Sequence, residues 1–447
     1  MQNSNKIMDN RMNVVTLTWP IFVEILLRTA LNTSDIFMLS GYSDKAVSAV
    51  GVISQITFFL VIISMMVSTG SSILIGQYNG AGRDKDSANI AVASICLGLC
   101  MGLILGLLAF FSCATIIDLY GLEQQVAQFG YEYLLISGSF TINVTLGIVF
   151  STILRAHGYS KSPMFINLAA GLINVIGNYC VLYQPFGLPV YGVQGVAIAT
   201  VFSQFISAVT LWYMLRHRKI DLPMASFLSI PAVFYKKILR IGVMNAGEIL
   251  SYNLSQMIII YFVVRMGTAS LTAFTYAQNI GRISFAFALA IGQASQIQTS
   301  YFIGKGWFED ISLRVQKYFL VAFVSSITIT VIIYLFRFDV INLFTNDPDV
   351  VILTAGLITG SILLEGGRVF NLVFISSLKG AGDITFPVQI GIASMWGIGV
   401  SLTYLLGIYF GFGVIGAWLA IAADEWFRGI IMLFRWRSKK WTKFTFS

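Results

Sequence analysis

Three ionisable side chains interrupt the first apolar stretch of this sequence, residues 14–40. They are Glu24, Arg28 and Asp35. In an α-helix these spacings place all three within about 40° of one another, so they form one charged stripe. A stretch of this length spans the ~30 Å hydrocarbon core of a bilayer, where a charge costs about 2.5–3.5 kcal/mol to insert. The stripe is therefore expected to face protein or water and to mark an ion or substrate pathway.

Asp35 is the member of this stripe without an oppositely charged residue one turn away. Glu24 and Arg28 are four residues apart and could neutralise each other as a local ion pair. Arg28 lies about 10 Å from Asp35 along the helix axis, too far for a direct bond without side-chain reach. A carboxylate that is unpaired at membrane depth either takes up a proton or binds a cation. We therefore expect Asp35 to be functional.

Asn174 and Asn178 lie one turn apart in the fifth apolar stretch, and Thr200 lies in the sixth. Their amide and hydroxyl oxygens suit a small hard cation that is also bound by a carboxylate. An alternative is that the two asparagines form interhelical hydrogen bonds that hold the bundle together. The residues alone leave both interpretations open.

A second polar stripe, in the seventh apolar stretch, consists of Glu248, Ser251, Tyr252 and Ser255. Glu248 has no arginine one turn away on its own helix, unlike Glu24. It is therefore a candidate for contact with a cationic substrate or a proton.

Two further groups of charges lie in the tenth and twelfth stretches. Glu365 and Arg368 are three residues apart, while Asp424, Glu425 and Arg428 lie within one turn. Both spacings favour local ion pairing. The second-half candidates for substrate contact or coupling are Glu248, Tyr252, Glu365 and Arg368.

The composition is that of a polytopic membrane protein. Of the 447 residues 57% are hydrophobic and 11% are charged, and the mean hydropathy is +0.80; soluble domains carry about 25% charged residues. The net charge of +8 comes from basic residues in short loops, which argues against nucleic-acid binding.

The polar N-terminal stretch, residues 1–13, lacks the apolar core of a signal peptide. The four cysteines lack zinc-site spacing, and His157 and His217 are expected in solvated loops.

The chain contains twelve apolar stretches long enough to be transmembrane helices, which predicts an all-α fold. They are residues 14–40, 47–75, 90–117, 131–154, 164–183, 192–215, 238–264, 271–302, 318–335, 351–378, 386–409 and 413–434. The longest connection predicts an N-lobe over 1–215, a cytoplasmic linker over 216–237 and a C-lobe over 238–447 with a basic tail. Because basic residues concentrate in alternate loops and the tail, we expect both termini in the cytoplasm.

The two halves repeat each other at an offset of about 224 residues (248 minus 24). Glu24–Leu26 recurs as Glu248–Leu250, Leu154-Arg155 as Leu378-Lys379, and Pro163 as Pro387. An even number of helices per repeat makes the two copies parallel. Transporters use this architecture for alternating access.

Neither an ATP-binding motif nor a catalytic Ser–His–Asp set is present, so active transport would draw on an ion gradient and an enzyme is not expected. Two alternatives stay open. One is a flippase for lipid-linked precursors, and the other is a membrane receptor or enzyme.

An ordered set of motifs resembles the multidrug and toxic compound extrusion (MATE) transporters, in particular the bacterial branch with NorM- and DinF-type proteins. The motifs are Thr33-x-Asp35, Leu154-Arg155-Ala156-x-Gly158, Asn174-x-x-x-Asn178, Gly192-Val193-x-Gly195 and Leu378-Lys379-Gly380-Ala381-Gly382-Asp383. The resemblance implies a V-shaped bundle of two six-helix lobes. It implies a monomer in the bacterial plasma membrane that exports organic cations, driven by Na⁺ and/or H⁺ entry. Neither a cofactor besides that ion nor an ATPase partner is implied.

The resemblance also implies a cation site at Asp35, Asn174, Asn178 and Thr200 with Glu24 nearby, in which Asp35, Asn174 and Asn178 bind Na⁺. It implies a role for Glu248. The chain departs from the family pattern in the tenth helix, where Arg368 stands at an expected carboxylate position. Either Glu365 substitutes for it or the second lobe lacks an ion site.

Overall fold

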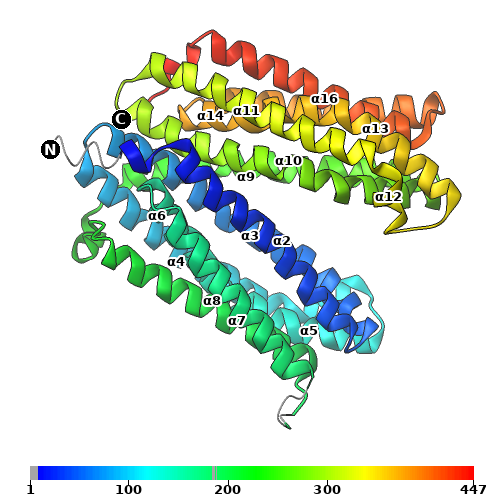
Figure 1. Cartoon of the computed structure of the whole chain (residues 1–447). Coiled ribbons are helices and arrows are strands. Elements are labelled where there is room, and N and C mark those ends of the chain that lie inside the picture. Colours follow the sequence, from blue (N-terminus) through cyan, green and yellow to red (C-terminus); the bar gives the residue numbers. More distant parts are fainter. Residues whose placement is uncertain (1–8, 184–186, 188, 447) are drawn as a thin grey trace. The chain divides into compact units, whose positions relative to one another are not determined.

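The computed structural model describes residues 9–183, 187 and 189–446, and this part of the chain is helical with no β-strand (Figure 1). Residues 1–8 of the polar N-terminal stretch lie outside the described residues. The chain divides into two compact units. The first contains the described residues of Met1–Ile75 and Arg83–Ala246, and the second contains Gly76–Gly82 and Gly247–Ser447. The lobe boundaries expected from the sequence, at 215 and 238, stay a prediction.

Helices α2 to α8 build most of the first unit. Their bounds are α2 Val14–Ser40, α3 Asp44–Gly80, α4 Asp84–Tyr120, α5 Gln124–Ser139, α6 Thr141–Ala156, α7 Lys161–Leu182 and α8 Gly192–His217. A 3₁₀ turn, Met224–Ser229, leads into α9, Ala232–Arg265. Within this unit α7 packs on α8 and α2, and α4 packs on α5 and α6. The packing of α2 on α7 is what brings the first charged stripe to the asparagines of the fifth stretch.

The second unit is built from α10 onwards. Its elements are α10 Thr268–Gly304, α11 Phe308–Leu335, α12 Arg337–Asn342, α13 Pro348–Phe370, α14 Ser376–Gly380, α15 Thr385–Ser394 and α16 Gly413–Arg437. Helix α13 packs on α10, α11 and α16. The core between them includes Phe274 and Trp418, which meet edge to face at 5.4 Å between ring centroids.

Each predicted apolar stretch coincides with helix in the structure. Within the described residues nine helices are long and apolar enough to cross a membrane, or ten if the bent pair α5 and α6 is one span. That pair meets at Phe140 with a bend of 44°. The remaining stretches, in α10 and α16, are helical but more polar; α16 contains Asp424, Glu425 and Arg428.

Local signals explain several helix ends. The Asn13 side chain caps α2 by accepting a hydrogen bond from the backbone N–H of Val15, at 3.1 Å. Asp347 caps α13 in the same way, with Pro348 in the first turn, where its missing N–H is not needed. A glycine also sets one helix crossing: a Cβ added to Gly102 of α4 would lie 2.7 Å from the Cα of Ile142 in α6. Glycine therefore lets these two backbones approach closely.

Three π-helical segments interrupt the second unit, at Asn371–Ile375, Met395–Val400 and Thr403–Tyr409. Such segments recur at functional sites, because an extra residue in the turn re-aims the side chains around it. The first begins at Asn371, directly after α13, and the second follows Ser394 at the end of α15. Both residues contact the charged side chains of α16, as described below.

His157 corrects one expectation from the sequence. It was expected in a solvated loop, but it is partly buried at the end of α6, with Nδ1 2.8 Å from the carbonyl oxygen of Ile153. His217 stacks on Tyr213 at the end of α8, with 6.1 Å between ring centroids.

Candidate functional site

The site in the first unit is built around Asp35 on α2. The amide Nδ2 of Asn178, on α7, donates a hydrogen bond to Asp35 Oδ1 at 2.8 Å. Asn178 is 1% exposed, whereas Asp35 is half-buried. The other amide atom, Asn178 Oδ1, is buried without a hydrogen-bond partner. A carboxylate and a free amide oxygen therefore lie beside each other at this point.

Asn174 and Thr200 lie next to this pair. Asn174 Nδ2 donates to Thr200 Oγ1 at 3.1 Å, and the Thr200 hydroxyl donates to the carbonyl oxygen of Val196 at 2.9 Å. Tyr133 of α5, which sequence reasoning missed, also hydrogen-bonds Thr200. The structure thus joins Asn174 to Thr200 and Asn178 to Asp35. It does not join Asn174 to Asp35.

Glu24 lies on the same helix as Asp35 but in a different environment. The Arg155 guanidinium at the end of α6 pairs with Glu24 Oε2, and Asn167 Nδ2 of α7 donates to Glu24 Oε1 at 3.0 Å. The local pair with Arg28 that the sequence suggested is absent from the ion pairs of the described chain, and the Arg28 side chain is exposed. Arg155 is the partner instead, because α6 brings a guanidinium to the buried side of α2.

Glu248 has the equivalent partner in the second unit. Lys379 Nζ of α14 donates to Glu248 Oε2 at 2.6 Å. The two ion pairs are related by the internal repeat, since Glu248 and Lys379 follow Glu24 and Arg155 by the same 224 residues. Both motifs recur in the sequence, so matching them would have predicted this pairing. Sequence reasoning noted that Glu248 has no arginine one turn away on its own helix, and the structure adds Lys379 of another helix as its partner.

The surroundings of the two pairs differ at one repeat position. Asn167, which donates to Glu24, is itself held by Ser207, whose hydroxyl donates to Asn167 Oδ1 at 3.0 Å. The repeat places Gly391 at the corresponding position, and a Cβ added there would lie 3.5 Å from Glu248 Oε1. The second unit therefore lacks the amide donor that the first provides.

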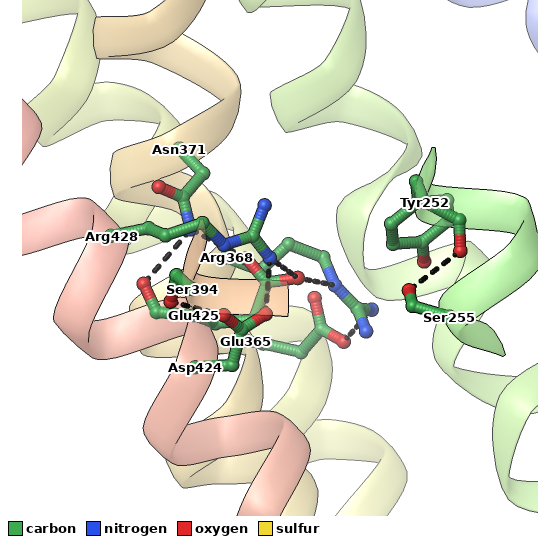
Figure 2. Close-up of polar contacts among 9 residues, drawn as sticks. All are labelled: Tyr252, Ser255, Glu365, Arg368, Asn371, Ser394, Asp424, Glu425 and Arg428. Carbon is green, nitrogen blue, oxygen red and sulfur yellow. Dashed lines mark hydrogen bonds and ion pairs between the residues drawn. The ribbon is translucent and has the colours of Figure 1, made fainter. Parts of the chain in front are cut away.

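A larger group of charges lies between α13 and α16 (Figure 2). Arg368 Nη1 lies 2.5 Å from Glu365 Oε1 on α13. On α16, Arg428 Nη2 lies 2.7 Å from Asp424 Oδ2 and 3.2 Å from Glu425 Oε1. Both local pairings predicted from the sequence are therefore confirmed. We refer to these five residues as the charged cluster.

The structure adds contacts that the sequence did not predict. Arg368 Nε lies 3.9 Å from Glu425 Oε1, which joins the two local groups. Asn371 Nδ2 donates to Glu425 Oε2 at 2.5 Å, and the hydroxyl of Ser394 donates to Asp424 Oδ1. Asn371 begins the π-helical turn after α13, and Ser394 ends α15 directly before the second π-helical turn.

Tyr252 and Ser255 lie on α9 near the charged cluster (Figure 2). The Ser255 hydroxyl donates to the Tyr252 carbonyl oxygen at 2.8 Å, within the helix. Ser251 of the same stripe accepts a hydrogen bond from Trp396 Nε1 at 2.9 Å. The second polar stripe is thus divided between local bonds and contacts with neighbouring helices.

Comparison with known proteins gives a consistent assignment. The MatE family model matches residues 20–180 and again 246–405. "Uncharacterized transporter YisQ" of Bacillus subtilis is 37% identical over 439 residues, which cover 97% of this chain and 95% of that protein. "Probable multidrug resistance protein NorM" of Thermotoga maritima is 26% identical over 434 residues, covering 97% and 93%.

Solved structures show the same fold. "Crystal structure of MATE in the bent conformation" superposes with a TM-score of 0.89 at 20% identity and covers 96% of this chain and 95% of that chain. "Outward-facing conformation of a multidrug resistance MATE family transporter of the MOP superfamily" gives 0.88 at 20% identity, covering 96% of each. The double match of the family model confirms the two-fold repeat predicted from the sequence.

Proposed function

Because this chain belongs to the MatE family of membrane transporters, we propose that it is a secondary antiporter that exports organic, amphipathic cations in exchange for sodium ions or protons. The multi-pass helical fold and the NorM relatives support efflux. The choice of a cationic substrate and of an ion gradient is our proposal. We also propose that both termini lie in the cytoplasm, on the basis of the basic loops and tail.

The contacts of Asp35 are the observation that supports ion coupling best. Glu24, Glu248 and Glu365 each contact a basic side chain. Asp35 contacts an amide, and no ion pair of the described residues includes it. A carboxylate at membrane depth that lacks a basic partner has a free charge to balance. An entering proton or sodium ion would balance it.

The mechanism we propose uses this charge as the switch. With a cation bound, the pair formed by Asp35 and Asn178 is neutral and α2 can pack on α7 without an uncompensated charge. With the cation released, Asp35 is ionised and keeps the amide hydrogen bond from Asn178. The two states favour different packing of α2, which would link cation entry to the alternation of access.

The test is efflux of a fluorescent organic cation from proteoliposomes, with a sodium gradient and a pH gradient imposed separately. Asp35→Asn removes the charge and keeps the hydrogen-bonding shape, so we expect gradient-driven efflux to fall at least tenfold in a folded protein. Glu132→Gln, a carboxylate change elsewhere in the first unit, serves as the matched control. Full efflux by Asp35→Asn would refute the site. Wild-type efflux with neither gradient would favour the flippase alternative.

A further inference from the structure

The charged cluster of α13 and α16 contains five ionisable side chains with little access to solvent. Glu365 is 0% exposed, Asp424 and Arg428 are 5% exposed, and Glu425 is 6% exposed. The side chain of Arg368 is 18% exposed and lies over the ring of Phe285, 4.6 Å from its centroid. Water therefore contributes little to balancing these charges.

The charges in the cluster do not cancel. Two guanidinium groups and three carboxylates give a formal charge of −1 (2 minus 3). Asn371 from the π-helical turn, Ser394 from α15 and Tyr252 from α9 face the cluster and are uncharged. Arg282 of α10, where that helix packs against Glu365, is exposed and belongs to no ion pair of the described residues. Glu248 and Lys379, on α9 and α14, already neutralise each other. An unbalanced charge in a buried site costs several kcal/mol, so the cluster requires one positive charge.

Only one carboxylate oxygen of the cluster lacks a donor. Five of the six oxygens contact Arg368, Arg428, Asn371 or Ser394. The sixth, Glu365 Oε2, is buried and has no hydrogen-bond partner. An ionised oxygen left in this way pays its full desolvation cost, whereas a neutral O–H in the same place costs much less.

We propose that the charged cluster is a proton-binding site and that Glu365 Oε2 carries the proton. The proton brings the cluster to zero net charge and removes the unpaired anionic oxygen. It gives the second unit a cation site of its own, at the helix where the sequence departs from the family pattern through Arg368. The binding itself does not depend on the proposed antiport, and only its role in transport rests on that function.

The geometry favours a proton over a metal ion. A proton needs one free oxygen, whereas hard metal cations take about six or more oxygen ligands. Beside Glu365 Oε2, one further buried oxygen without a partner lies next to the cluster, on Asn371 (Oδ1). The described residues contain no group of three or more His, Cys, Asp or Glu side chains arranged to hold a metal ion. The two guanidinium groups would also repel a metal cation.

Infrared spectroscopy of the purified protein tests the proposal without any transport substrate. At neutral pH the wild-type protein should show a protonated-carboxyl band that shifts in heavy water. Glu365→Gln should abolish that band. Glu132→Gln, a carboxylate change in the first unit away from both proposed sites, is the matched control and should leave it in place. A band that is absent from the wild type, or unchanged in Glu365→Gln, would overturn the proposal.

A second variant tests whether Glu365 is protonated because of the net charge of the cluster or only because it is buried. Glu425→Gln leaves Glu365 in place but brings the fixed charge to zero (2 minus 2), so the band should disappear although Glu365 is present. Persistence of the band in Glu425→Gln would refute the charge argument. Replacing choline chloride by sodium chloride should not change the band, and its loss in sodium would assign the site to a metal ion. Absence of gradient-driven efflux would instead count against the proposed function and leave these results unaffected.

Discussion

Removal of Arg155 should destabilise the first unit more than removal of both Arg155 and its partner. Arg155→Met leaves the largely buried Glu24 side chain with one remaining donor, Asn167. Breaking a buried ion pair on one side costs about 3–5 kcal/mol. We take the lower end, about 3 kcal/mol, because the side chains of Arg155 and Glu24 are still 19% and 13% exposed.

The double variant Glu24→Gln/Arg155→Met should recover much of this loss. Glutamine keeps the shape and accepts the Asn167 hydrogen bond but has no charge to bury. The coupling energy of the cycle is then about 2–3 kcal/mol, far from the roughly 0.5 kcal/mol that independent sites show. For a unit of this size 3 kcal/mol corresponds to about 6–12 °C in melting temperature.

The assay is thermal unfolding of the four proteins in one detergent, followed by the intrinsic tryptophan fluorescence. The repeat-related cycle, with Glu248→Gln and Lys379→Met, serves as an internal comparison and should show coupling of the same sign. Additive effects of Glu24→Gln and Arg155→Met would refute the reasoning, because the contact would then carry no net interaction. A Glu24→Arg/Arg155→Glu exchange that retains the wild-type melting temperature would confirm that charge pairing is the source.

Two further predictions concern stability. Burial lowers the pKa of His157 from 6.5, so the unfolded chain binds more protons than the folded one below that pH. The wild type should therefore lose stability as the pH falls from 6.5 toward the lower folded pKa, and His157→Gln should show a flatter melting profile over that range; equal slopes would exclude this histidine. Gly102→Ala should destabilise the first unit by about 1–3 kcal/mol through overpacking against Ile142. Gly147→Ala, where an added Cβ meets nothing within 4 Å, is the control, and equal melting temperatures of the two variants would contradict the close approach.

The comparison between the two units explains why their ion pairs need not be equally strong. Glu24 accepts from Arg155 and Asn167, and Ser207 holds Asn167 in place. Gly391 occupies the Asn167 position in the second unit. Both repeats therefore contain the ion pair, but only the first contains the amide hydrogen bond to its glutamate. A hydrogen bond to a charged group contributes about 1.5–3 kcal/mol. The glycine at the Asn167 position is therefore enough to make the ion pair of Glu248 less stable than that of Glu24.

The sequence by itself determined the class of protein and where its apolar stretches form helices. Length and hydropathy are local properties, and a stretch that must satisfy its backbone in lipid has to be helical. The repeat was also visible, because Glu248 and Lys379 follow Glu24 and Arg155 at one offset. Pairs one turn apart, such as Glu365 with Arg368, were predictable because helix geometry alone brings them together.

Tertiary structure alone decided which of these charges meet across helices. Glu24 and Arg155 are 131 residues apart, and their contact joins side chains of α2 and α6 that no local spacing brings together. The joining of Arg368 to Glu425 depends on how α13 packs on α16. Only that packing leaves Glu365 Oε2 buried without a donor. Burial and long-range contact are properties of the folded chain, which is why the sequence could propose these residues but could not assign their partners.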